Sequence, residues 1–73
     1  MSQIHINETN VQSYVGQIIR AEKNGEVLQG KIVGLSDCIV ADRNGQPVRP
    51  ITIEERTRLV DFHPADGWKV TVN

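Results

Sequence analysis

Basic side chains are the residues of this 73-residue sequence whose type and spacing are most typical of a binding chemistry. Arg49, Arg56 and Arg58 occur close together, and Lys69 follows in the last segment. If the fold brings these four to one face, they can contact phosphates and give salt-dependent nucleic-acid binding. The opposite interpretation is a solvated surface balanced by neighbouring carboxylates, and the formal net charge of −1 favours it.

A second candidate surface would bind a protein partner. Its carboxylates flank the expected turns, and they are Glu22, Glu26, Asp37 and Asp42. Such an acidic edge would suit a basic partner, whereas ordinary surface charge at turns is the plainer interpretation. Trp68 is added to this set because it stands beside the turn-forming stretch 63–67, which favours partial exposure, while Phe62 is expected in the core.

Catalytic and metal-binding patterns are not found. Cys38, His5 and His63 fit no zinc-ligand spacing, so we expect no metal and no cofactor. Cys38 lies in the most apolar short run and is expected to be an inert core thiol rather than a nucleophile. A chain of this length has little room for an enclosed substrate pocket. We therefore expect a protein that is not an enzyme.

The compartment is inferred from the same composition. One cysteine cannot form an internal disulfide, which favours a reducing environment. The beginning "MSQIHINETN" has neither the basic nor the apolar region of a secretory signal. No run approaches the roughly 18 apolar residues of a membrane span. The sequence therefore predicts a cytoplasmic protein, encoded by a cell or by a phage.

Turn signals divide the chain into short strands. Asn24-Gly25 predicts a two-residue type I′ hairpin turn, and Asn44-Gly45 predicts a second reversal. Gly30, in the middle of the returning strand 27–35, predicts a sharp bend or a close approach of another backbone. Cys38–Ala41 reads as a short central strand, and the prolines that follow the second turn place the next strand at an edge.

The remaining elements complete one small domain over residues 1–73. Val11, Tyr14 and Val15 have helical spacing and predict a short N-terminal helix. Residues 1–8 are either an added edge strand or a flexible segment. Residues 51–62 are ambiguous: Ile51 and Ile53 alternate as in a strand, residues 53–56 could form a 3₁₀ turn, and 59–62 read as strand again. Alternation over 68–72 predicts the last strand. The sum favours a mainly β fold, a small five-stranded antiparallel barrel of the SH3-like or Sm-like type.

The segment Val11–Ala41 resembles the first signature of the Sm family. The residues that carry the resemblance are Tyr14-Val15-Gly16, Asn24-Gly25, Leu28-Gln29-Gly30, Ile32 and Asp37. Bacterial Hfq-type members have a similar "NG-x-x-LQG-x-I" run, but the second half lacks their Tyr-Lys-His run and the later Arg-Gly of eukaryotic members. The resemblance therefore implies the barrel, and no RNA-contact residue is carried over.

The whole chain is similar in order to the Rof family, small monomeric Sm-like inhibitors of the transcription terminator Rho. Shared features are a hairpin followed by Leu28-Gln29, a glycine turn at Gly45, the His63-Pro64 turn and the β-branched ending 70–72. The resemblance implies a monomer, or a weak homo-oligomer, that binds RNA or an RNA-handling protein and modulates transcription. The alternative is a structural subunit, of a phage or another complex, that associates through exposed strands.

Overall fold

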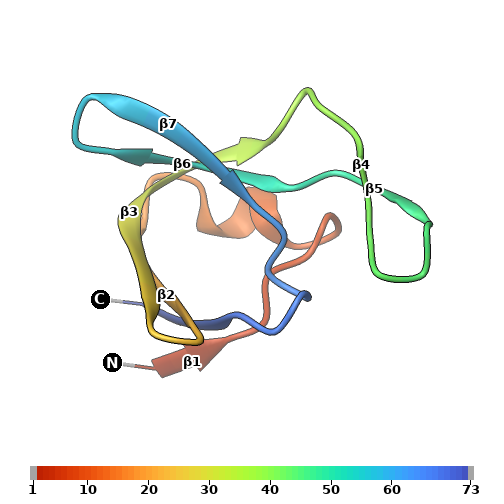
Figure 1. Ribbon diagram of the computed structural model, residues 1–73. Helices are drawn as coiled ribbons and strands as arrows, with labels where there is room; N and C mark the ends of the chain where they lie inside the picture. Colours follow the sequence, from red (N-terminus) through yellow and green to blue (C-terminus); the bar gives the residue numbers. More distant parts are fainter. Residues whose placement is uncertain (1, 73) are drawn as a thin grey trace.

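Antiparallel strands make up most of the chain in the computed structural model, which describes residues 2–72. A six-stranded sheet has the order β1-β8-β2-β3-β6-β7, and β4 and β5 form a separate ribbon. The strands are β1 (Ser2–Ile4), β2 (Ile18–Lys23), β3 (Glu26–Leu35), β4 (Val40–Ala41), β5 (Pro47–Val48), β6 (Ile51–Glu55), β7 (Arg58–Phe62) and β8 (Lys69–Val72). Figure 1 shows the sheet curving around a core while the ribbon lies to one side. The expectation of a mainly antiparallel β fold is confirmed.

Both Asn-Gly pairs lie at chain reversals. Asn24 and Gly25 have φ values of 48° and 85°, and their flanking residues pair as the last rung between β2 and β3. Positive φ at both central residues is the requirement of a type I′ turn. At the second pair, the Gly45 N–H donates to the Asp42 carbonyl over 3.0 Å, and the chain returns as β5. The sequence signal for both hairpins is therefore confirmed.

Gly30 lies where the backbone of β6 comes closest to β3. A Cβ at this position would overlap the carbonyl oxygen of Glu54 and would lie 2.9 Å from its carbonyl carbon. Four residues later, Gly34 has a φ of 148°, directly after a bulge that shifts the register between β3 and β6. The close approach expected at Gly30 is confirmed, and the bulge just before Gly34 adds further curvature to β3.

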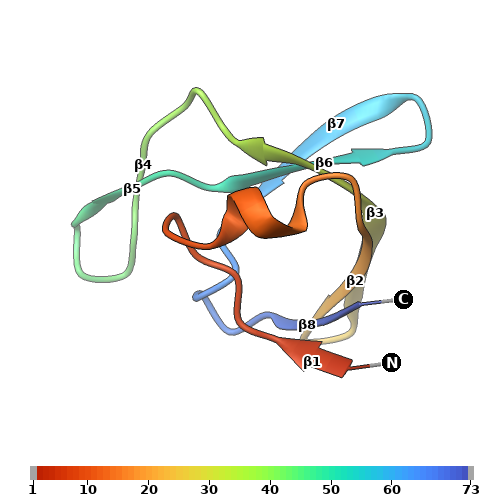
Figure 2. The same ribbon diagram turned by 180° about the vertical axis from the view of Figure 1, so that it is seen from behind.

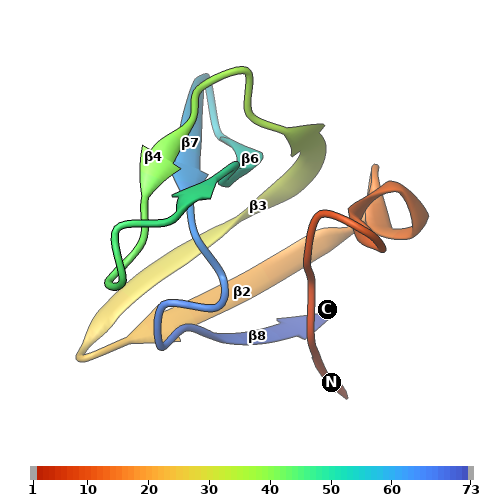
Figure 3. The ribbon, with the colours of Figure 1, turned by 90° about the vertical axis from the view of Figure 1, so that its right-hand side faces the viewer.

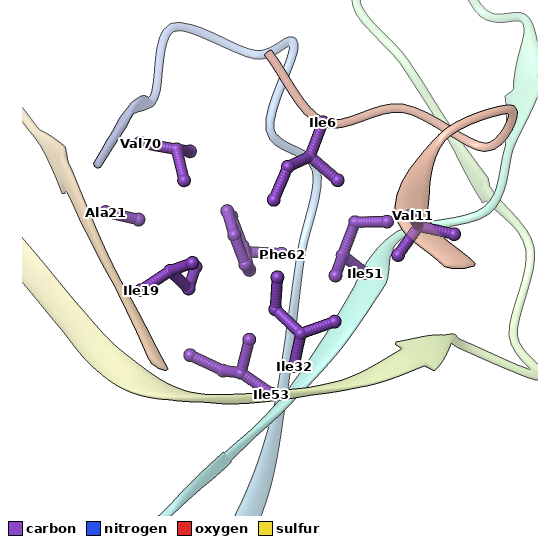
Figure 4. Close-up of a cluster of buried hydrophobic side chains, with 9 residues drawn as sticks. All are labelled: Ile6, Val11, Ile19, Ala21, Ile32, Ile51, Ile53, Phe62 and Val70. Carbon is purple, nitrogen blue, oxygen red and sulfur yellow. The ribbon is translucent and has the colours of Figure 1, made fainter. Parts of the chain in front are cut away.

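The core lies inside the curved sheet and draws on five strands and the N-terminal segment. Alternating residues of each strand point inward, as the two-residue period of a strand requires. Its buried members, drawn in Figure 4, are Ile6, Val11, Ile19, Ala21, Ile32, Ile51, Ile53, Phe62 and Val70. The expected core position of Phe62 is thereby confirmed, and the partly buried Trp68 packs against the same cluster.

No α-helix forms within residues 2–72 at the place where the sequence predicts a short N-terminal helix. A single 3₁₀ turn, η1 (Val11–Tyr14), forms there and contacts β3 (Figure 2). Four residues form too few hydrogen bonds to sustain an α-helix, and Gly16, with a φ of 90°, turns the chain towards β2. The turn is instead anchored by Val11, whose side chain is buried in the core.

Within the described part of the chain, the two outer strands of the six-stranded sheet are not hydrogen-bonded to each other. Among residues 2–72, β1 and β7 are the two outer strands and do not pair with each other, so a closed five-stranded barrel is not formed. Ser2–Ile4 pairs with β8, which is the edge-strand arrangement that the sequence left open beside a flexible one. The N-terminal segment therefore extends the sheet by one strand beyond the five expected.

The prediction that Cys38–Ala41 forms a central strand is wrong. Only Val40–Ala41 is a strand, and its partner is β5 in the separate ribbon. Cys38 is exposed, and Ile39 retains 61% of its accessible surface. The apolar run belongs to an extension, residues 38–48, which we call the arm (Figure 3). Composition indicated burial, but no strand of the main sheet pairs with this ribbon among residues 2–72.

Candidate partner-binding surface

Two of the four predicted basic residues lie at the reversal between β6 and β7. Arg56 and Thr57 form its two-residue turn, and Arg56 has a φ of 58°, unusual for a residue with a side chain. Arg58 donates to the Glu55 carboxylate over 3.0 Å. Lys31, which the sequence did not single out, lines the same shallow groove of about 710 Å³, together with two carboxylates. The groove is therefore mixed in charge rather than basic.

The other two predicted basic residues lie elsewhere. Arg49 follows β5 and is exposed, and its backbone N–H donates to the Glu8 carboxylate over 2.9 Å. Lys69 lies on β8, opposite Glu22 of β2. The structure thus divides the four cations among three places and brings only Arg56 and Arg58 together.

The predicted acidic edge is likewise divided. Glu22 forms an ion pair with Arg20 over 3.0 Å, and Glu26 is exposed beside the β2–β3 turn. Asp42 accepts hydrogen bonds of 2.8 and 2.9 Å from two backbone N–H groups of the arm turn, so its carboxylate has a structural role. Asp37 is exposed in the segment that leads into the arm. These carboxylates do not converge on one contact surface.

Asp66 joins three segments that are distant in the sequence. Its carboxylate contacts Lys23 Nζ over 2.9 Å and Arg43 Nε over 2.7 Å, and thereby links β2, the arm and the β7–β8 turn. Lys23 Nζ also lies 5.7 Å from the ring centroid of Trp68, which meets Phe62 edge-to-face at 5.5 Å. Trp68 is therefore half-buried beneath this cluster. The sequence analysis did not identify this cluster around Asp66, because no local pattern links residues that are this far apart in the chain.

Ion pairs of this kind lower the pKa values of two carboxyl groups, those of Asp66 and Glu55. The pKa of Asp66 lies below its ordinary value, chiefly because Lys23 donates a hydrogen bond to the carboxylate, and then because Arg43 does. The pKa of Glu55 is also lowered, first by the hydrogen bond from Arg58. A carboxyl group whose pKa is lower in the folded state than in the unfolded state stabilises the fold. This stabilisation is fully present at pH values above the unfolded-state pKa, which is about 4. The stabilisation is lost as the pH falls through the folded-state pKa.

We expect Asp66→Asn to lower the melting temperature at pH 6, because the neutral amide loses both ion pairs. The difference from wild type should shrink as the pH is lowered below about 4 and Asp66 itself becomes protonated. Thermal unfolding followed by circular dichroism across this range measures it. Glu26→Gln is the matched control and should follow the wild-type profile. A deficit of equal size at every pH would contradict the electrostatic explanation.

Asp61 fixes the start of the arm. Its carboxylate accepts hydrogen bonds from Thr52 Oγ1 over 2.6 Å and from Ser36 Oγ over 2.9 Å. Both donors are buried polar residues, and Ser36 Oγ in turn accepts the Cys38 N–H over 3.0 Å. The chain that enters the arm is thus tied to β6 and β7 by one exposed residue.

A cleft lies between the arm and the N-terminal segment. It has a volume of about 370 Å³, and its lining comes from three stretches of chain, residues 6–9, the segment 47–51 and the turn 63–65. A second hollow of about 390 Å³, beside Asp66, shares His63 and Ala65 with it. Residues of the arm therefore line part of both hollows.

Within residues 2–72, no three His, Cys, Asp or Glu residues lie close enough to hold a metal ion. The described part of the chain also contains no helix with the length and apolar character needed to cross a membrane. Comparison with known protein families, with curated proteins and with solved structures gave no match.

Proposed function

We propose that this chain is a non-enzymatic, cytoplasmic binding module of the Sm-like kind, which modulates RNA handling by contacting a protein that itself acts on RNA. A Rho-type termination factor is the candidate partner that the resemblance supplies. Single-stranded RNA is the competing ligand. The proposal assigns five bent strands, β2, β3, β6, β7 and β8, to a curved Sm-like sheet that, within residues 2–72, stays open between its outer strands.

The distribution of charge is the observation that carries the choice of a protein over RNA. Proteins that bind nucleic acid present clustered cations on one face, whereas Arg49, Lys69 and the Arg56–Arg58 pair are apart. Arg58 is also engaged by Glu55. Apolar side chains are exposed instead, and Ile39 and Leu59 keep 61% and 64% of their surface. Aliphatic groups beside mixed charges suit a protein interface.

The structural roles of the shared residues support the Sm-like part of the proposal. Asn24-Gly25 forms the turn, Gly30 admits the backbone of β6, and Ile32 is in the core. These roles explain why such residues recur in a small bent sheet. Unrelated small β folds need similar turn and glycine residues. The class of partner is therefore inferred from the family resemblance, and binding to that partner is tested directly.

The test is affinity capture from bacterial lysate with the immobilised chain, with and without ribonuclease. We expect a Rho-type factor to be retained in both cases, because the contact is with the protein. RNA alone should pass through at about 150 mM salt, and the double variant Arg56→Ala/Arg58→Ala should behave as wild type. Loss of the factor after ribonuclease treatment, or salt-dependent retention of RNA that the double variant abolishes, would overturn the proposal in favour of RNA binding.

An assembly subunit is the second candidate, favoured by the open edge of β7. Among residues 2–72, this strand pairs only with β6, and Leu59 on it is exposed. An unpaired strand edge can add a strand from another chain. Light scattering coupled to size exclusion distinguishes the two functions. A monomer agrees with the binding module, whereas a stable large oligomer would favour assembly.

A further inference from the structure

The cleft between the arm and the N-terminal segment has a preorganised wall. Asn7 Oδ1 accepts the N–H groups of Thr9 and Asn10 over 2.8 and 3.0 Å, and Asn10 Oδ1 accepts the Asn7 N–H over 2.8 Å. The Asn10 side-chain amide also donates to the His5 carbonyl over 2.7 Å. Such a network fixes a polar loop before any ligand arrives, which lowers the entropic cost of binding.

A second stretch of the lining comes from the end of the arm and from Arg49 and Ile51, which follow it. The Arg49 N–H donates to Glu8 over 2.9 Å, a hydrogen bond between residues 41 positions apart. This bond joins the two stretches of the lining. The aliphatic part of the lining, which we call the floor, is formed by the buried Ile6 and Ile51 and the half-buried Val48 and Pro64.

Among the described residues, the cleft lining carries one carboxylate and one guanidinium group, those of Glu8 and Arg49. The Glu8 carboxylate keeps its negative charge, and one of its oxygens accepts the backbone N–H of Arg49. The guanidinium of Arg49 is exposed, and no carboxylate of residues 2–72 lies within ion-pair distance of it. An apolar floor with one available cation suits a ligand that has an aliphatic group next to a negative charge.

We propose that this cleft binds an extended peptide segment of a partner protein, with an aliphatic side chain on the floor and an adjacent Asp or Glu paired with Arg49. The inference rests on the proposed function in one respect, that the partner is a protein. A nucleotide would satisfy the same cation through its phosphate. The lining favours the peptide, since most of its described residues are aliphatic or polar and His63 alone among them supplies a ring on which a base could stack.

The experiment is NMR titration of the ¹⁵N-labelled chain with the peptide acetyl-Gly-Leu-Asp-Gly-amide. We expect saturable shifts at the amides of Ile6, Val48 and Ile51. The matched peptide with Asn in place of Asp, and separately the variant Arg49→Gln, should each weaken binding about three- to fivefold, as for an exposed ion pair. Arg58→Gln, in the other groove, is the control and should bind as wild type.

Three results would overturn the inference. These are an absence of cleft shifts, shifts that map to the β6–β7 turn, and tighter binding of uridine 5′-monophosphate than of the Asp peptide. Equal affinity of both peptides for wild type would remove the role of Arg49. If the Rho-type factor is captured while the cleft stays unperturbed, this inference fails and the proposed function stands. If the peptide binds but no factor is captured, the function fails and the cleft assignment remains.

Discussion

Gly30→Ala is expected to destabilise the fold by about 3 kcal/mol or more, the upper range for an overpacked interior. The added methyl would overlap the Glu54 carbonyl, and it would lie 3.3 Å from the Cα of Glu55. The atoms in the way belong to backbone, so no side-chain rotation relieves the overlap. β6 cannot withdraw freely either, because Ile53 pairs with Ile32 and both are buried. A domain of this size has only a few kcal/mol of net stability.

Chemical unfolding in urea, followed by circular dichroism, measures the effect. Gln29→Ala is the matched control, since that side chain is exposed and the hydrogen bond to Glu55 uses the backbone N–H. We expect the control within about 0.5 kcal/mol of wild type. A Gly30→Ala variant as stable as the control would mean that β3 and β6 do not approach as described.

Asp61→Ala is expected to cost about 2–4 kcal/mol, although Asp61 itself is exposed. The substitution leaves the hydroxyls of Ser36 and Thr52 without their acceptor, and an unsatisfied buried polar group costs about 1–3 kcal/mol. Both donors are almost fully buried, with 4% and 8% of their surface accessible. The arm should also loosen, since Ser36 holds the Cys38 N–H.

Two measurements check this prediction. Urea unfolding gives the stability, and hydrogen exchange at the Cys38 amide reports the anchoring of the arm. Asp37→Ala is the control, because Asp37 is exposed and makes no side-chain hydrogen bond among residues 2–72. Faster exchange should appear in Asp61→Ala alone. Unchanged stability and exchange would show that the three-residue network does not hold the arm.

Local sequence signals predicted the parts of the fold that local physics determines. Asn24-Gly25 has one favoured backbone geometry, so the turn followed from two residues. Gly30 marked a close contact without indicating which strand supplied it. The turn at Arg56-Thr57 was missed because neither residue is typical of a positive-φ position, and the alternative of a 3₁₀ turn was wrong, since β6 runs unbroken to Glu55.

Tertiary context decided the rest. Cys38–Ala41 was placed in the core by its apolar composition, but burial depends on whether another element covers the segment, and composition does not contain that information. The candidate cations were chosen for their nearness in sequence, and the course of β5 and β6 separated Arg49 from Arg56. Asp66 contacts Arg43, which is 23 positions earlier in the chain, and Lys23, which is 43 positions earlier. Only the folded chain brings these residues together.

The central claim is that this fold contacts an RNA-handling protein and not RNA. It is tested most directly by fluorescence anisotropy of the labelled chain, titrated separately with a purified Rho-type factor and with a single-stranded RNA. The account predicts saturable binding to the factor, retained by Asp37→Ala and weakened in the destabilised Gly30→Ala, and no binding to RNA at about 150 mM salt. Binding to the RNA with no binding to the factor would contradict it.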